Sequence, residues 1–129
     1  MEIVNSIYGK DCIVLPHRRY DLITGEFRAA NHSRYLGSVE ERWDPQSVLD
    51  QASFVHFSDW PLPKPWMHHM YAQVNAAQPD CHGEPDSDEW DCRDREIWLG
   101  LHQDFRERRE LSLRVYSVSS VAYRELYVE

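Results

Sequence analysis

The sequence has few glycines and no long apolar run, and each shortage excludes a class of protein. Only 5 of the 129 residues are glycine. There is no P-loop, no dinucleotide-binding glycine pattern and no Gly-X-Ser-X-Gly nucleophile motif. No apolar stretch is long enough to cross a bilayer, and the first residues do not form a signal-peptide pattern. Any binding or catalytic site of this chain must therefore be built from motifs other than these.

Cysteine is also scarce, with 3 residues and no Cys-X-X-Cys pair. Cys12 lies in an apolar run and is expected to be buried. Cys81 and Cys92 flank an acidic stretch, and they can either form a disulfide in an oxidising compartment or stay as thiols in the cytosol. These cysteines, His82 and the His68-His69 pair also suggest zinc, but their spacing does not fit a zinc motif.

Acidic residues outnumber basic ones, 22 to 14, which gives a formal net charge of −8. This balance argues against broad, non-specific binding of nucleic acid. Hydrophobic residues at 42% and aromatic residues at 12% are sufficient for a packed core. The length predicts one domain that buries roughly two-thirds of its unfolded surface.

The first third of the chain predicts short elements. Residues 3–8 have the apolar spacing of one helix face, which Gly9 would end. Residues 12–16 are predicted to be a buried strand that ends at a proline. Residues 17–34 are read as strand plus loop, with a short strand at 20–23. The arginines of this stretch are expected to face either solvent or an anionic partner: Arg18, Arg19, Arg28 and Arg34.

The middle of the chain contains a well-marked helix start. Asp44 is predicted to cap a helix over residues 46–51, with Pro45 at its first position. A buried strand over residues 54–57 follows, and then a short helix over residues 67–77. Because Met1 leads directly into what reads as the middle of an element, we expect the chain to be part of a larger protein.

The last third predicts a long helix. Residues 79–91 are a loop by composition, and Asp91 is expected to cap a helix over residues 92–111. Three arginines, at 106, 108 and 109, would lie in its last turns, where cations suit the helix dipole. Residues 111–129 alternate in polarity and are read as a strand or an irregular tail. The apolar stripe of the helix is expected to consist of Ile97, Trp98, Leu101 and Phe105.

Residues 54–66 are the stretch most suggestive of function. His56 interrupts the apolar run, and three prolines alternate around Lys64, so that this lysine is carried on a stiff loop. A histidine at the end of a strand and a lysine on a rigid turn predict a site for an anion, with or without a metal. The alternatives are a partly buried structural histidine and an ordinary surface lysine. At least one of Trp60 and Trp66 is expected to stack on the prolines as a structural lock.

His56-Phe57-Ser58-Asp59 together with Lys64-Pro65-Trp66 resembles the C-terminal signature of glycosyltransferase family 8, the glycogenin-like enzymes. The similarity is greatest to its fungal Golgi members of the glucose N-acetyltransferase type. The resemblance implies that His56 ligates a divalent metal, usually manganese. It also implies that Lys64 contacts the diphosphate of a nucleotide sugar, with Ser58 and Trp66 in the same binding site.

The fold implied by this resemblance is α/β. Residues 1–110 would be the C-terminal part of a GT-A nucleotide-sugar transferase domain, an incomplete sheet with flanking helices, and residues 111–129 an unrecognised tail. Glu2 would lie near the sugar or acceptor pocket; the alternative is a solvated glutamate at a helix start. The family's Asp-X-Asp metal motif is missing, since the only match, Asp86-Ser87-Asp88, lies in the acidic loop. The isolated chain is therefore expected to be inactive.

The reaction implied by the resemblance is the retaining transfer of a sugar from a UDP-sugar to a carbohydrate hydroxyl, with Mn²⁺ or a similar cation. Placement in the Golgi lumen follows from the family, through an N-terminal anchor outside this chain. If the chain were complete as given, the cytoplasm would be expected. The alternative function is a non-catalytic module that binds another protein, either as a homo-oligomer or by pairing with the N-terminal half of the same enzyme.

Overall fold

A computed structural model describes residues 2–62, 64–83 and 90–125 of the chain, and for residues 2, 4, 5 and 114–125 only the backbone. The elements, in chain order, are α1 (Glu2–Tyr8), α2 (His17–Tyr20), β1 (Leu22–Ile23), the 3₁₀ helix η1 (Thr24–Arg28), α3 (Ser33–Leu36), α4 (Pro45–Gln51), β2 (Val55–His56), α5 (Tyr71–Ala77), β3 (His82–Gly83), β4 (Trp90–Asp91) and α6 (Arg93–Glu125).

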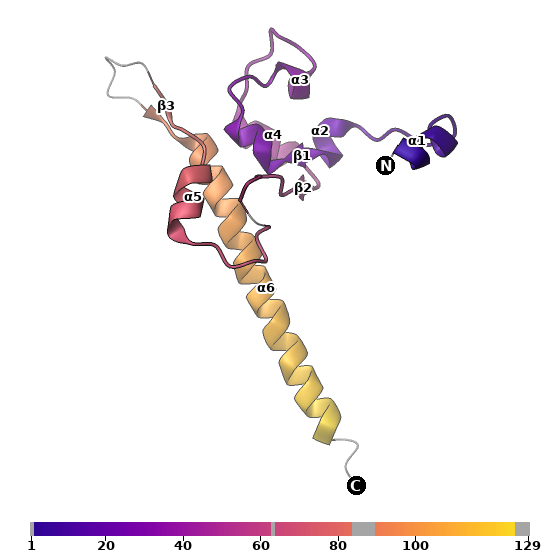
Figure 1. Ribbon diagram of the computed structural model, residues 1–129, viewed down its shortest axis with the longest axis vertical. Coiled ribbons are helices and arrows are strands. Elements are labelled where there is room, and N and C mark those ends of the chain that lie inside the picture. Colours follow the sequence, from indigo (N-terminus) through magenta and orange to yellow (C-terminus); the bar gives the residue numbers. More distant parts are fainter. Residues whose placement is uncertain (1, 63, 84–89, 126–129) are drawn as a thin grey trace.

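The long helix α6 is the element against which most of the others pack (Figure 1). Its first half contacts α4 and η1. Arg95 also donates a hydrogen bond of 2.8 Å to the carbonyl oxygen of Pro79, just after α5. The second half of α6 extends downward beyond the other elements, and α1 lies apart from them, to the right in this view (Figure 1). The packed part of the chain is therefore small.

The core consists of side chains from almost every part of this packed region. Trp98 on α6 is fully buried at its centre. Its position confirms the apolar stripe predicted for this helix, because Ile97 and Leu101 also pack against the same cluster. The other buried apolar residues of the cluster are Leu22, Phe27, Tyr35, Leu36, Leu62 and Ala77.

Two very small sheets are present in the described residues. β1 and β2 are parallel, with Leu22 opposite Val55 and Ile23 opposite His56. β3 and β4 are antiparallel and form a hairpin. The predicted α/β class is confirmed in this coarse sense. The predicted strand at 54–57 is shortened to two residues and is not buried, since Phe54 is 56% exposed.

Three predicted helices are confirmed, with one change of boundary. α1 ends before Gly9, as the sequence indicated. α4 begins with Pro45 at its first position, and the Asp44 carboxylate accepts a 2.8 Å hydrogen bond from the backbone N–H of Ser47. α5 begins at Tyr71, four residues later than the predicted start. Residues 17–34, read as strand plus loop, also contain the helical turns α2 and η1.

The predicted buried strand at residues 12–16 is wrong. Ile13 and Val14 are 89% and 86% exposed, and Cys12 is exposed rather than buried. An apolar run forms a strand only where a neighbouring strand supplies its hydrogen bonds, and no described segment pairs with this one. The apolar pattern of residues 12–16 therefore belongs to a segment whose apolar side chains are exposed within the described part of the chain.

The prediction of a strand or irregular tail after residue 111 is also wrong, because α6 continues to Glu125. Arg106, Arg108 and Arg109 consequently lie in the middle of the helix and not in its last turns. Helix propensity and alternation are weak signals, and extending a helix that packing has already nucleated costs little per residue.

Cys81 and Cys92 are joined in a disulfide, one of the two alternatives that the sequence left open. The bond connects the beginning of the β3–β4 hairpin to the residue that precedes α6. Asp86-Ser87-Asp88 lies outside the described residues. The cross-link therefore fixes the start of α6 to the segment after α5.

Reducing this disulfide is expected to lower the free energy of unfolding by about 3 kcal/mol, because the bond closes a loop of 11 residues in the unfolded chain. Urea unfolding with and without reductant measures the difference. Cys12→Ser is the control and should leave the unfolding midpoint unchanged. Equal midpoints for the oxidised and reduced chain would contradict the structural role of the bond.

Candidate functional site

A buried aspartate, Asp59, lies three residues beyond the end of β2 and collects hydrogen bonds from distant parts of the chain. The hydroxyl of Thr24 donates to its Oδ2 at 2.5 Å, and the indole N–H of Trp98 donates to its Oδ1 at 2.8 Å. Nε2 of His102 lies 3.2 Å from Oδ2. The guanidinium of Arg28 is 4.0 Å from Oδ1. One carboxylate thus connects η1, the loop after β2 and α6.

The surroundings of Asp59 favour its ionised form. Burial raises the pKa of this carboxyl. The hydrogen bonds from His102, Thr24 and Trp98 lower the pKa by more than burial raises it, so that it lies below its ordinary value. A buried carboxylate without such donors would be strongly destabilising. Asp59 is therefore a charged anchor with its lone pairs satisfied.

Thr24 extends the same network to the backbone of the functional stretch. Its hydroxyl oxygen accepts a 2.9 Å hydrogen bond from the backbone N–H of Ser58. Next to it, a Cβ on Gly25 would lie 3.2 Å from the carbonyl oxygen of Ser58, a contact that a side chain would make too tight. The close approach of these two backbones explains the glycine at this position.

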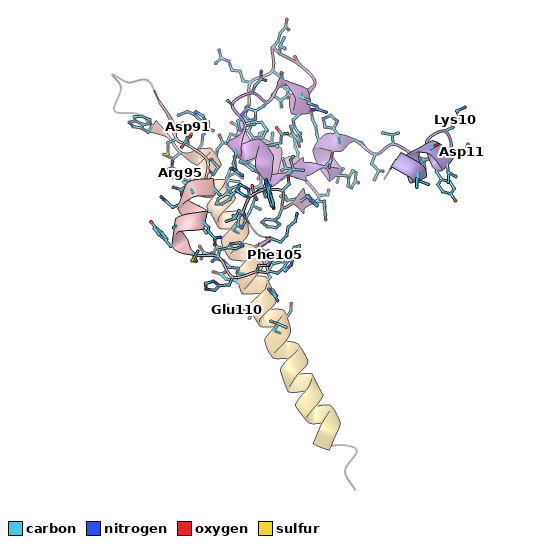
Figure 2. All side chains as sticks on the ribbon, viewed as in Figure 1. Lys10, Asp11, Asp91, Arg95, Phe105 and Glu110 are labelled. Carbon is cyan, nitrogen blue, oxygen red and sulfur yellow. A yellow bond between two sulfur atoms is a disulfide. The ribbon has the colours of Figure 1, made fainter. Side chains whose placement is uncertain are left out.

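The proline-containing loop after Asp59 is fastened at several points. The ammonium of Lys64 donates to the carbonyl oxygen of Phe57, and Nε2 of His69 lies 3.0 Å from the carbonyl oxygen of Lys64. Arg109 of α6 donates to the carbonyl oxygen of Trp66. Phe105, labelled in Figure 2, lies on the side of α6 that this loop crosses. The loop is thus held against α6 and does not project freely.

The two tryptophans that flank this loop behave differently. Trp60 is 88% exposed. Trp66 is half-exposed, and its ring centroid lies 6.1 Å from that of Phe105. The aromatic contact that fastens the loop is therefore made to α6 by Trp66, while Trp60 presents its ring to solvent.

The predicted site residues are only partly brought together. His56 and Ser58 lie at the end of β2, where the His56 side chain is exposed and Ser58 is half-buried. Lys64 is half-buried and is tied to the same segment through Phe57. Glu2 begins α1, which lies apart from this segment (Figure 1), and its side chain is outside the described atoms.

The anchor residues of this site were not identified from the sequence. Asp59 belongs to the stretch that carried the family resemblance, but no role was given to it. Its partners, Thr24, Trp98 and His102, come from segments up to 43 residues away in the chain. The signals available were an acid two residues after a predicted buried strand and a tryptophan on the apolar stripe of a helix.

The described residues do not form a metal site by themselves. Among them, no group of three or more histidine, cysteine, aspartate or glutamate side chains is placed to hold an ion. The zinc interpretation is wrong, because Cys81 and Cys92 are bonded to each other. For a metal such as Mn²⁺, His56 offers one imidazole donor, and further ligands would have to come from elsewhere.

Three of the four arginines of residues 17–34 have partners within the chain. Arg18 forms an exposed ion pair with Glu41 at 2.6 Å. Arg19 donates to the hydroxyl of Ser53 at 3.0 Å, and the guanidinium of Arg28 lies 4.0 Å from the carboxylate of Asp59. These contacts favour structural roles over recognition of a phosphate.

Most of the chain is similar to fungal proteins named glucose N-acetyltransferase 1. The protein of Gibberella zeae is 49% identical over 110 residues, which are 85% of this chain and 23% of that protein. The protein of Aspergillus fumigatus is 44% identical over 119 residues, 92% of this chain and 31% of that protein. The predicted similarity to this fungal group is confirmed, while membership of family 8 remains a prediction.

The chain thus spans between 23% and 31% of the length of these two relatives. No protein-family model and no solved structure matches it. Within the described residues, no helix combines the length and the apolar character needed to span a bilayer.

Replacing Asp59 by asparagine is expected to lower the free energy of unfolding by about 3 kcal/mol, because charge-assisted hydrogen bonds are lost and buried donors are left poorly paired. Chemical denaturation of the purified chain measures this change. Asp50→Asn is the matched control: Asp50 is exposed on α4 and bonded only locally to Gln46, so its loss is expected to be about 0.5 kcal/mol or less. Equal effects of the two substitutions would contradict the anchor.

The stability that Asp59 provides is expected to depend on pH. Because the pKa of Asp59 is lower in the folded chain than its ordinary value of about 4, the contribution is complete above that value. It is lost as the pH falls through the lower, folded-state pKa. Unfolding free energies measured from about pH 6 down to about pH 2 should converge for the wild type and Asp59→Asn towards low pH. A constant difference would contradict the assignment.

Proposed function

We propose that this chain is the C-terminal part of a glycosyltransferase of family 8 with a GT-A, α/β architecture, to which residues 1–110 contribute. The reaction is the retaining transfer of a sugar from a UDP-sugar to a carbohydrate hydroxyl. Two observations support this proposal. The similar fungal proteins are named glucose N-acetyltransferase 1, which puts a sugar and a transfer reaction in their name. The stretch from His56 to Trp66 carries the family resemblance.

The observation that carries the proposal is the position of this stretch at the carboxyl ends of two parallel strands. β1 and β2 run side by side and end at Ile23 and His56, so the segments that follow both strands emerge at the same edge. In open α/β sheets, ligands bind outside the carboxyl ends of the strands. His56, Ser58 and Lys64 are all at or after this edge.

Lys64 is the proposed partner of the donor diphosphate. Its ammonium has three N–H donors, of which one is directed at the carbonyl oxygen of Phe57. The remaining donors are available to phosphate oxygens, and the fastened loop fixes where the charge stands. A cation that is positioned before the reaction stabilises the negative charge that develops on the departing diphosphate. Ser58 and Trp66 complete this side of the proposed nucleotide-sugar site.

His56 is the proposed metal ligand contributed by this chain. Imidazole and carboxylate donors suit Mn²⁺, but the described residues do not assemble a full set of ligands. The other ligands, and with them the complete site, would belong to the part of the longer protein that this chain does not contain. Glu2 keeps its proposed place near the sugar or acceptor pocket in that larger assembly.

The proposed compartment is the Golgi lumen. The disulfide between Cys81 and Cys92 supports it, because such bonds persist in oxidising compartments and are rare in the cytosol. Attachment to the membrane would depend on a segment outside this chain.

A second candidate function is a non-catalytic module that binds another polypeptide. Ile3 and Ile7 on α1, together with the segment from Ile13 to Leu15, expose a large amount of apolar side chain. Exposed apolar side chains of this kind suit a contact with another polypeptide. The proposed occupant is the N-terminal half of the same enzyme or a second copy of this chain. Within the glycosyltransferase proposal, the same surface would contact the rest of the catalytic domain.

A chimaera tests the catalytic proposal directly. The matching segment of the Aspergillus fumigatus relative is replaced by this chain, and UDP release from UDP-glucose and UDP-N-acetylglucosamine is measured. His56→Ala and Lys64→Ala are each expected to reduce the rate about 100-fold or more, because the first removes a proposed metal ligand and the second removes the proposed partner of the diphosphate. His68→Ala, an exposed histidine after the same loop, is the matched control and should stay within about twofold.

Calorimetric titration of the isolated chain with UDP, with and without Mn²⁺, provides a second readout. Weak binding that is lost in Lys64→Ala would show that half of the site persists in this chain. A chimaera that transfers sugar equally well with and without His56 and Lys64 would overturn the proposed roles. An inactive chimaera that binds no UDP would favour the binding module.

A further inference from the structure

A cavity of about 430 Å³ lies beside the carboxyl end of β1, on residues to which the proposed function gives no role. This volume is within the range of small-molecule sites, roughly 300 to 1,000 Å³. Its wall includes Ile23, the residue that pairs in register with His56. The residues that line it are His17, Asp21, Ile23, Glu26, Arg34 and Tyr35.

One side of the cavity is held rigidly by hydrogen bonds. Nε2 of His17 lies 2.5 Å from the carbonyl oxygen of Tyr35, so this nitrogen is the donor of a hydrogen bond that fixes the ring. The hydroxyl of Tyr35 donates to the carbonyl oxygen of Arg18 at 2.9 Å. The two rings also meet edge to face, with centroids 5.5 Å apart. The imidazole and the phenol ring are therefore fixed before any ligand arrives.

The carboxylate of Glu26 is the group of this cavity that a ligand could engage as a hydrogen-bond acceptor. It is half-buried, and no hydrogen bond to its carboxylate is present among the described residues. Burial raises its pKa, and the nearby charge of Arg34 lowers it only in part. Nδ1 of His32 lies 3.9 Å from Oε2, too far for a hydrogen bond, and is itself buried without a partner among these residues. The Glu26 carboxylate and the unpaired Nδ1 of His32 thus lie close to each other beside the cavity.

The kinds of group in the cavity restrict what it can bind. Asp21 and Glu26 are acceptors when ionised, and Arg34 is a donor only. A phosphate or another anion would be repelled by the two carboxylates, and an apolar ligand would leave polar groups without partners. A neutral polyol satisfies both kinds, because each hydroxyl donates one hydrogen bond and accepts others. Ile23 and the ring of Tyr35 offer apolar surface to the C–H face of such a ligand.

We propose that this cavity binds a sugar unit through its hydroxyl groups, with Glu26 as acceptor and Arg34 as donor, and that it forms the acceptor side of the transferase. The second part rests on the proposed function, while sugar binding itself does not. Since Ile23 connects the cavity to the strand edge that carries His56, a sugar held here would lie next to the proposed donor site.

Titration of the intact chain with D-glucose, followed by protein NMR without UDP or metal, tests the proposal. Saturable shifts are expected, together with a dissociation constant about tenfold higher in Glu26→Gln, which keeps the size of the side chain but removes its charge. Glu96→Gln, an exposed glutamate on α6, is the matched control and should bind as the wild type does. Arg34→Gln should also weaken binding.

Unfolding curves of the variants guard against a trivial loss of structure. Glu26→Gln is expected to be at least as stable as the wild type, because it removes a half-buried charge. Absence of saturable binding by the wild type, or equal binding by Glu26→Gln, would overturn the proposal. Because the titration contains no nucleotide, its failure leaves the roles of His56 and Lys64 standing. An inactive chimaera, conversely, leaves a sugar-binding cavity standing and removes only its assignment to the acceptor.

Discussion

The burial of one ionised carboxylate, that of Asp59, is the constraint on which the rest of the packed region depends. Taking a carboxylate out of water costs several kcal/mol unless donors replace the lost hydration. Here the donors come from η1 and α6, so the carboxylate is stable only when both elements are in place. Conversely, the indole N–H of the fully buried Trp98 needs an acceptor, and Asp59 supplies it. The Asp59 carboxylate therefore couples elements that lie far apart in the sequence.

This anchor also determines how the functional stretch is presented. Asp59 stands between the end of β2 and the proline-containing loop, so fixing it fixes the start of that loop. Contacts to Phe57 and Arg109 then hold the loop against α6. The result is a rigid support for His56 and Lys64 at the edge of a sheet that has two strands among the described residues. A parallel sheet is rarely found without helices or other elements packed on both of its faces. The exposed apolar side chains of α1 and of residues 13–15 agree with this expectation.

The sequence predicted those features that depend on neighbouring residues. The cap at Asp44 and the apolar stripe around Trp98 are local patterns, and both are confirmed. The expected strand at residues 12–16 and the expected tail after residue 111 failed, because a strand depends on partners that sequence periodicity does not reveal and a helix can extend through residues of poor propensity. The contacts of Asp59 and the cavity around Glu26 join residues far apart in the chain, so no spacing rule could identify them.

The most direct test of this account is a double-mutant cycle between Asp59→Asn and Trp98→Phe, measured by chemical denaturation. If the carboxylate and the indole act as one unit, the two losses of unfolding free energy will not add, and the coupling will be about 1 kcal/mol or more. Losses that add to within about 0.3 kcal/mol would mean that the two residues stabilise the chain independently. In that case Asp59 would not be the anchor that joins the loop to α6.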